Sequence, residues 1–264
     1  MELGIVGHGA VGKACADGFK ALGHHVSIHD IALDTKMKDL CKCQIIYICV
    51  PTPVGEGGQC DVSIVRGCVQ ELSLLAFDGL VVIKSTVVPG TTASLKKLFQ
   101  KLNLCFVPEF LRERCAYEDF TLKHDLLAVG VDSEKDAKKI IESHGKYPKS
   151  VSVLTPTEAE ILKYFSNVYN STKVIFANNI FEICEKLNAD YTSVLDAYMK
   201  RQVDPRDYLE VSESLRGYGG VCLPKDTKAI AHLAKMLGTN LNLFDQVDTD
   251  NKKLKTTVFD GMRS

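Results

Sequence analysis

The chain has 264 residues, of which 45% are hydrophobic and 25% are charged, and these proportions exclude a disordered chain, a collagen and a coiled coil. Its 32 Lys and Arg residues face 33 Asp and Glu residues, so the net charge is -1 and no strong block of either sign is present. This balance argues against a nucleic-acid-binding protein and favours small-molecule chemistry.

Short apolar runs alternate with amphipathic stretches through residues 1–154. We expect strands at 3–6, 26–29, 45–50, 80–83, 104–107, 126–131 and 151–154. Helical periodicity marks 11–22, 62–77, 92–102 and 134–144. This alternation predicts βαβ units and an α/β domain, a doubly wound parallel sheet, over residues 1–154.

The pattern changes in residues 155–264, where no strand is evident. Helices are expected at 158–187, 191–199, 227–237 and 241–259. We therefore predict an all-helical second domain over residues 155–264.

Nothing in the sequence predicts a membrane or secreted protein. The chain starts on strand residues without a basic and apolar leader, and no apolar stretch reaches membrane-spanning length, so we expect a cytoplasmic protein. Ten cysteines are present, but a chain of this size needs no disulfide framework, and we expect most to be small buried hydrophobes. Cys41 and Cys43 form the one close pair and lack two further ligands at comparable spacing, so no metal site is predicted.

The sequence GHGAVG at residues 7–12 follows the first expected strand and opens the first helix. Such glycines permit a tight turn, close approach to a diphosphate and close packing of helix on strand, although a glycine turn without ligand is the alternative. Asp30 ends the second strand, where it can accept hydrogen bonds from both ribose hydroxyls and repel a 2′-phosphate. These features predict a Rossmann-type domain that binds NAD rather than NADP. The expected contacts are Gly7, Gly9, Ala10, Val11, Gly12 and Asp30.

Three more loops, at 50–53, 85–90 and 108–113, leave the carboxyl ends of expected strands. Ligands bind at that edge of an open α/β sheet, although each loop alone could be ordinary turn chemistry. The further cofactor contacts expected there are Val50, Pro51, Thr52, Ser85, Thr86 and Glu113.

The sequence GYGGVCLPKD at residues 217–226 is the densest chemical signal. Its adjacent glycines let backbone pass close to a ligand. Pro224 suits the first position of a helix, so we expect Cys222 just before a helix N-terminus, where the dipole favours a thiolate. Cys222 is a candidate nucleophile. A buried structural cysteine would not explain the glycines or the charged pair Lys225 and Asp226.

Lys163 and Asn167 lie four residues apart on the long helix and therefore share a face, which Asn170 and Asn178 continue. A solvated face more often shows Glu and Lys pairs than repeated Asn. A site lining and a solvated face remain equal alternatives on this evidence.

The chain resembles the UDP-glucose/GDP-mannose dehydrogenase family over its whole length. The resemblance rests on the glycine motif, VPTP at 50–53, STVVPGTT at 85–92, PEFLRE at 108–113, Ala159-Glu160 with Lys163 and Asn167, and GYGGVCLPKD at 217–226, all in family order. Family members continue into a second Rossmann-like domain that binds much of the nucleotide, and this chain is expected to lack it. Arg114 stands where the family usually has Gly.

The resemblance implies four-electron oxidation of a nucleotide sugar by two NAD, through a cysteine-bound thiohemiacetal and thioester. UDP-glucose, oxidised to UDP-glucuronate, is the leading substrate. By the same resemblance Cys222 is the nucleophile, while Lys163 and Asn167 stabilise the alkoxide and the oxyanions. Asp226 and a water held by Thr86 relay protons, and Glu109 is the base for thioester hydrolysis.

The resemblance also implies a homodimer through the helical domain, in which Arg206 reaches the partner's sugar, and a Glu113 that supports its loop. The implied substrate contacts are Glu109, Phe110, Leu111, Arg112, Lys163, Asn167, Arg206, Tyr218 and Gly219. Two other hypotheses remain open: a single-step NAD-dependent dehydrogenase of a hydroxy acid, and a nucleotide-sugar-binding or partner-dependent fragment without activity of its own.

Overall fold

The computed structural model describes residues 1–55, 58–201, 217–219 and 222–254. The chain divides into two compact units, Met1–Asn167 and Val168–Ser264. The division falls within the long helix α6 (Pro156–Lys186), so the domain boundary at residues 154 and 155 stays a prediction.

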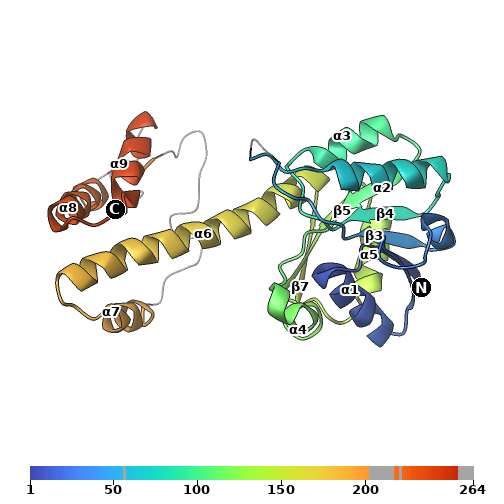
Figure 1. The fold of residues 1–264 in the computed structure, drawn as a ribbon, viewed down its shortest axis with the longest axis horizontal. Helices are drawn as coiled ribbons and strands as arrows, with labels where there is room; N and C mark the ends of the chain where they lie inside the picture. The colour runs from blue at the N-terminus through green and yellow to red at the C-terminus, as the bar shows by residue number, and fades with distance from the viewer. Residues whose placement is uncertain (56–57, 202–216, 220–221, 255–264) are drawn as a thin grey trace. The chain divides into compact units, whose positions relative to one another are not determined.

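The first unit is built on a seven-stranded sheet with the strand order β2-β1-β3-β4-β5-β6-β7 (Figure 1). Each strand lies within two residues of its expected ends. The strands are β1 (Glu2–Val6), β2 (His25–His29), β3 (Ile45–Ile48), β4 (Leu80–Ile83), β5 (Asn103–Phe106), β6 (Leu126–Gly130) and β7 (Ser150–Leu154).

The expectation of a doubly wound parallel sheet is confirmed except at one junction, between β5 and β6. β6 and β7 are parallel to each other, but β6 meets β5 antiparallel through the pair Phe106 and Gly130. Between β5 and β6 the chain forms the short elements η2 (Glu113–Cys115) and α4 (Ala116–Thr121), which the sequence did not predict. A six-residue helix is about 9 Å long, which is shorter than the helices that usually return a chain along a sheet.

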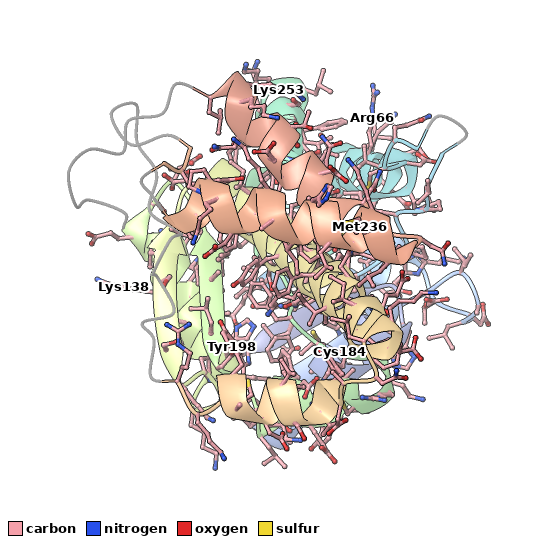
Figure 2. The ribbon with its side chains drawn as sticks, turned by 90° about the vertical axis from the view of Figure 1, so that its left-hand side faces the viewer. Arg66, Lys138, Cys184, Tyr198, Met236 and Lys253 are labelled. Carbon is pink, nitrogen blue, oxygen red and sulfur yellow. The ribbon has the colours of Figure 1, made fainter. Side chains whose placement is uncertain are left out.

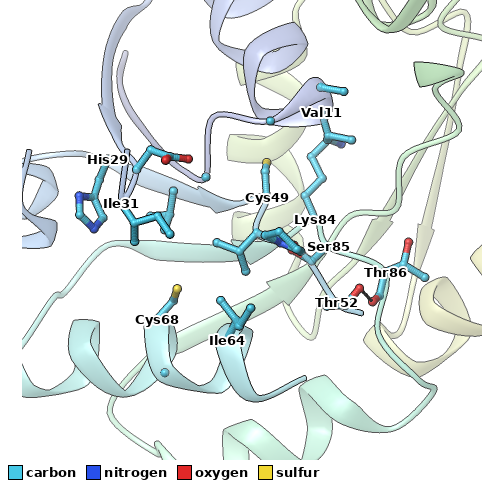
Figure 3. Close-up of a pocket in the computed structure, with 18 of the residues that line it drawn as sticks. Val11, His29, Ile31, Cys49, Thr52, Ile64, Cys68, Lys84, Ser85 and Thr86 are labelled. Atoms are coloured by element: carbon cyan, nitrogen blue, oxygen red, sulfur yellow. Dashed lines mark hydrogen bonds between the residues drawn. The ribbon is translucent and has the colours of Figure 1, made fainter. Parts of the chain in front are cut away.

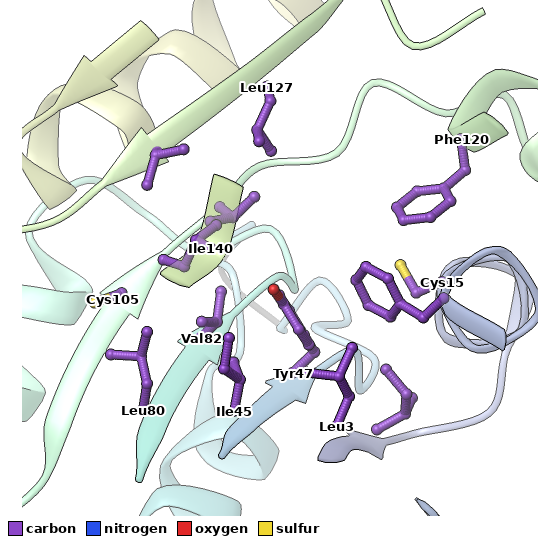
Figure 4. Packing of buried hydrophobic residues seen from close by; sticks show 14 of the residues in the cluster. Leu3, Cys15, Ile45, Tyr47, Leu80, Val82, Cys105, Phe120, Leu127 and Ile140 are labelled. Atoms are coloured by element: carbon purple, nitrogen blue, oxygen red, sulfur yellow. The ribbon is translucent and has the colours of Figure 1, made fainter. Parts of the chain in front are cut away.

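Helices cover both faces of the sheet, as expected for a doubly wound fold. The helices α1 (Ala10–Ala21), α4 and α5 (Glu134–His144) pack on one face. On the other lie η1 (Met37–Leu40), α2 (Ser63–Leu74) and α3 (Thr91–Leu98) (Figure 1). Side chains alternate between the two faces, because Ile45 and Tyr47 belong to the first cluster and Ile46 and Ile48 to the second. Figure 4 shows the first cluster, with Cys15 of α1 and Phe120 of α4 over the strands.

The second unit is helical wherever the structure describes it. It holds the later part of α6 with α7 (Tyr191–Tyr198), α8 (Cys222–Leu237) and α9 (Leu243–Lys253). A small core joins α6, α8 and α9 through Ile183, Ala231, Ala234 and Phe244. The helix expected at 241–259 thus runs to Lys253, and residues 255–259 lie outside the described residues.

The nine described cysteines are free thiols, and the expectation that most are buried is wrong. Cys15, Cys43, Cys105 and Cys184 are buried, whereas Cys41, Cys49, Cys60, Cys68 and Cys115 are partly exposed. Within the described part of the chain, no helix is both long and apolar enough to cross a membrane, and no three His, Cys, Asp or Glu side chains gather as metal ligands would.

Candidate active site

The glycine loop connects the end of β1 to the start of α1, and no side chain caps the N-terminus of α1. Gly7 has a φ of 90°, and a Cβ there would come 2.7 Å from the carbonyl oxygen of Cys49, so only glycine fits. Gly9 is the N-cap of α1 and supplies no capping side chain, and a Cβ on it would meet nothing within 4 Å. The leading N–H groups of α1 therefore face open space, where an anion can accept from them.

Gly12 lies one turn further on, where it allows close packing of α1 and does not contact the space in front of the helix. A Cβ on Gly12 would stand 1.9 Å from the carbonyl oxygen of Gly7, so glycine is needed for α1 to lie close to the loop and to Ile5. The residue does not line the pocket described below.

Asp30 follows β2 and points its carboxylate back to the glycine loop. The carboxylate accepts from the backbone N–H of Ala32 at 2.8 Å and of His8 at 2.6 Å. These two hydrogen bonds lower the pKa of Asp30, so the side chain is charged at neutral pH. Each oxygen retains a lone pair for a further donor.

These features surround a pocket of about 860 Å³ in the first unit (Figure 3). Ten of the twelve expected cofactor contacts line it, and so does Glu109. The ten are Gly7, Gly9, Ala10, Val11, Asp30, Val50, Pro51, Thr52, Ser85 and Thr86. Of the other two, Gly12 packs beneath, and the side chain of Glu113 lies outside the description.

One wall of this pocket is formed by α2 and was not predicted from the sequence. Ile64, Cys68 and Glu71 of α2 line it, as does Gly67. Their spacing of three to four residues places them on one helix face, which is the signal that could have identified them. His29, Ile31, Ala32, Met37, Cys49 and Lys84 were missed as well.

Two hydroxyl hydrogen bonds join the loops after β3 and β4. Ser85 donates through Oγ to the carbonyl oxygen of Val50 at 2.7 Å, and Thr52 donates through Oγ1 to that of Thr86 at 2.8 Å. The two expected loops therefore form one rim of the pocket.

Lys163 and Glu109 form a nearly buried ion pair. The Lys163 ammonium donates to the Glu109 carboxylate at 2.8 Å and to the Glu109 backbone carbonyl at 2.6 Å. Only 6% and 14% of the two side chains are exposed. The other carboxylate oxygen accepts from the N–H of Leu111 at 2.6 Å. Lys163 has a third N–H available for a reacting oxygen.

Glu160, one turn before Lys163 on α6, is fully buried. Its carboxylate accepts from the N–H of Gly90 at 2.5 Å and of Thr92 at 2.8 Å. It thereby caps α3, whose own N-cap Gly90 has no side chain to do so.

Arg112 forms an ion pair with Asp119 of α4. Its guanidinium donates to both carboxylate oxygens of Asp119, at 2.9 and 2.7 Å, and this lowers the pKa of Asp119. The expected substrate contact at Arg112 thus has an acidic partner already in place.

The structure corrects the expected position of Cys222. Cys222 is already helical in the described part of α8 (Cys222–Leu237), so it lies in the helix rather than just before it, and Pro224 is not the first helical residue. Proline is tolerated there because an N–H of the first turn has no intrahelical partner. The Cys222 side chain and all of Arg206 lie outside the described residues. Asp226 pairs with Lys225 at 3.3 Å, and both side chains are exposed.

The polar stripe on α6 does not share one environment. Lys163 is buried, whereas Asn167, Asn170 and Asn178 are exposed. Asn178 donates an amide N–H to the Val174 carbonyl of the same helix at 2.7 Å, which fits the solvated alternative at that position.

The segment before α8 contacts α9. The backbone N–H of Tyr218 donates to the Asn251 side chain at 2.7 Å, and the Asn251 amide donates to the Tyr218 carbonyl at 2.9 Å. Gly219 is the next residue after Tyr218.

Two sequence models of one family match the chain in succession. The NAD binding domain of the UDP-glucose/GDP-mannose dehydrogenase family matches residues 31–146, and its central domain matches residues 157–253. The chain belongs to the UDP-glucose/GDP-mannose dehydrogenase family. As in that family, its first unit binds NAD.

Relatives within the family are longer than this chain. UDP-glucose 6-dehydrogenase TuaD of Bacillus subtilis is 33% identical over 226 residues, which are 83% of this chain and 48% of that protein. UDP-glucose 6-dehydrogenase of Rickettsia prowazekii is 34% identical over 78% of this chain and 49% of its own length. The chain thus spans about half the length of these curated relatives.

Solved structures share the fold. GDP-mannose dehydrogenase from Pseudomonas aeruginosa, solved as a ternary complex, matches with a TM-score of 0.88 and 24% identity over 96% of this chain and 69% of that one. UDP-glucose dehydrogenase from Pyrobaculum islandicum matches with a TM-score of 0.71 and 26% identity over 96% and 68%.

Proposed function

We propose that the chain catalyses the NAD-dependent four-electron oxidation of a nucleotide sugar, UDP-glucose to UDP-glucuronate. The observation that supports this most is that one unit holds both the glycine-loop pocket with Asp30 and the buried pair of Lys163 and Glu109. The names of the UDP-glucose 6-dehydrogenase relatives support the choice of sugar nucleotide.

The residues of the pocket fit NAD. The N–H groups at the start of α1 would hold the diphosphate, and the charged Asp30 would accept from the ribose hydroxyls. The loops after β3 and β4 would contact the nicotinamide half through Val50, Pro51, Thr52, Ser85 and Thr86, and Glu113 would join them. Bound NAD supplies a hydride acceptor.

In the first oxidation the substrate hydroxyl loses a proton and its carbon loses a hydride, which leaves an aldehyde. The free N–H of Lys163, together with Asn167, stabilises the alkoxide that forms. Asp226 and a water held by Thr86 carry the proton away.

In the second oxidation the sulfur of Cys222 attacks the aldehyde carbon, and a thiohemiacetal forms. In the attack the thiol proton passes to the aldehyde oxygen, which becomes the hydroxyl of the thiohemiacetal. Loss of that hydroxyl proton to the same relay of Asp226 and water, and of a second hydride from the carbon, leaves a thioester. Glu109 removes a proton from a water that attacks the thioester carbonyl. The carbon–sulfur bond then breaks, which releases the acid and restores the thiol, so one acid accounts for two hydrides.

Substrate contacts are proposed at Phe110, Leu111, Arg112, Arg206, Tyr218 and Gly219, in addition to the residues of the reaction. A homodimer through the helical domain is also proposed. Large apolar side chains of the second unit that are more than half exposed support it, and Figure 2 shows one of them, Tyr198. They include Val168, Val174 and Phe176 of α6, Tyr198 of α7, and Met199 directly after α7.

A stoichiometric assay tests this function. Purified chain with UDP-glucose and NAD should yield two NADH for each UDP-glucuronate, and Cys222→Ser should abolish acid formation. No NADH with UDP-glucose, GDP-mannose or UDP-N-acetyl sugars would refute the proposal. A single NADH per product, unchanged in Cys222→Ser, would indicate the single-step dehydrogenase. Binding of the sugar nucleotide without turnover would indicate a binding fragment.

A further inference from the structure

Lys84 is a buried cation that the reaction described above does not use. It follows β4 directly, and its backbone N–H donates to the Ile48 carbonyl at 2.8 Å, so the strand geometry continues through it. Leu80 and Val82 face the core cluster under α1, and Lys84 shares their side by the alternation of the strand. Only 2% of the residue is exposed.

No carboxylate among the described residues lies within ion-pairing distance of the Lys84 ammonium. The ring centre of Phe120 lies 6.0 Å from Nζ of Lys84. The Glu109 carboxylate lines the same pocket as Lys84 and acts on the same two thiols, but it is paired with Lys163. An ammonium held out of water without an ion-pair partner of its own is costly.

The titratable groups around Lys84 include two histidines and two thiols. Burial, and after it the charge of Lys84, lowers the pKa of His124 to about 4 and that of His144 well below its usual range, so both are neutral at pH 7. Burial opposes ionisation of Cys15, but the hydrogen bond with Cys49 and the charge of Lys84 outweigh it and lower the Cys15 pKa. A Cys15 thiolate is therefore the competing partner that an experiment has to distinguish.

A second observation connects Lys84 to a ligand. Lys84 lines the same pocket as Gly9, Ala10 and Val11, and its side chain extends from the end of β4 toward Val11 (Figure 3). The start of α1 carries the positive end of the helix dipole and has no capping side chain. Two positive features thus border one pocket, and the diphosphate is the negatively charged part of NAD.

We propose that Lys84 is a cofactor-positioning residue, whose buried ammonium supplies the positive charge that holds the diphosphate of NAD at the start of α1. The inference rests on the NAD pocket and adds a residue to it. A charge surrounded by protein acts more strongly and over a longer distance than an exposed one. The unliganded protein bears the cost of the buried ammonium, and the arriving diphosphate removes it.

The test compares ligands that differ in the diphosphate. Binding of NADH and ADP-ribose is measured by calorimetry, and binding of adenosine by ligand-detected NMR, on the full chain. Lys84→Met should weaken NADH and ADP-ribose by at least about tenfold and adenosine by less than about twofold. Lys84→Gln should do the same, and Lys84→Arg should keep most of the affinity. Lys97→Met, at an exposed lysine of α3, is the matched control and should change nothing.

The melting temperature of the unliganded variants separates positioning from a structural role. Lys84→Met should melt at or above the temperature of the wild type, because it removes a buried charge. A lower melting temperature with unchanged NADH and ADP-ribose affinity would mean that the ammonium serves the fold, paired with a Cys15 thiolate, and would overturn the proposal. An equal loss for adenosine would overturn it too. A wild type that binds neither NADH nor ADP-ribose would refute the cofactor site itself, whereas wild-type binding with an unchanged Lys84→Met variant would refute the role of Lys84 alone.

Discussion

The ammonium of Lys163 lies 2.8 Å from the carboxylate of Glu109 and 2.6 Å from the backbone carbonyl oxygen of the same residue. Both side chains are largely withdrawn from water. A charge of this kind depends on its partner more than an exposed one does.

Removal of the Lys163 charge should destabilise the protein markedly. Lys163→Met leaves the Glu109 carboxylate nearly buried without its cation, so the free energy of unfolding in urea should fall by about 3 kcal/mol. Adding Glu109→Gln to Lys163→Met should restore part of the loss. Lys96→Met breaks the more exposed ion pair with Asp132 and should cost less than about 1 kcal/mol. Equal losses in the two single variants would contradict the buried pair.

Two glycines of the same loop should respond oppositely to alanine. Gly12→Ala places a methyl group 1.9 Å from the Gly7 carbonyl oxygen, so α1 has to move and stability should fall by roughly 2 kcal/mol. Gly9→Ala meets nothing within 4 Å and should leave the urea midpoint nearly unchanged. Its methyl group fills the space before α1, however, and should weaken NADH binding at least about tenfold, since the diphosphate needs that approach. The opposite pattern would place the cofactor elsewhere.

Asp30 should set the choice between the two nicotinamide cofactors. Asp30→Asn removes the charge that repels a 2′-phosphate, so the ratio of NADH to NADPH affinity should fall by about tenfold or more. The lowered pKa of Asp30 keeps this carboxylate charged from pH 8 to pH 5. The 2′-phosphate takes up a proton near a pKa of roughly 6, so the preference for NADH should weaken on acidification because of the phosphate and not because of Asp30. Fluorescence titrations with both reduced cofactors measure this ratio. An unchanged ratio in Asp30→Asn would remove Asp30 from the ribose site.

Stability should fall on acidification through His124. Its folded-state pKa is about 4, below the unfolded value of 6.5, so the unfolded chain binds the proton more tightly. The contribution is complete above pH 6.5 and is lost as the pH falls toward 4, by roughly 3 kcal/mol. His124→Gln should flatten this part of the curve of unfolding free energy against pH. His232→Gln, at an exposed position of α8, should leave the curve unchanged, and a curve equally steep in both variants would contradict the assignment.

Much of the fold and of the cofactor pocket could be predicted from local sequence patterns. The glycine loop and Asp30 could be predicted from the sequence because turn geometry and charge act over a few residues. The strands could be predicted from their apolar runs. The direction of β6 could not be predicted, because it depends on the path of the connection between β5 and β6, which has weak helical periodicity. Lys84 was passed over since a lysine is ordinarily exposed, and its burial arises from the packing of α1 and α4. The helical position of Cys222 was not predicted because a proline fits more than one position of a first turn.

Glu160 and Lys163 stand one turn apart on α6, and each fastens a different loop of the pocket rim. One carboxylate fixes the segment that runs from Thr86 into α3, while the ammonium fixes the segment that begins at Glu109 after β5. A single turn of helix moves as one rigid piece, so a displacement of either segment is passed to the other. A ligand that displaced one of these segments would therefore strain the hydrogen bonds of the other, because both sets of bonds start from the same turn of α6.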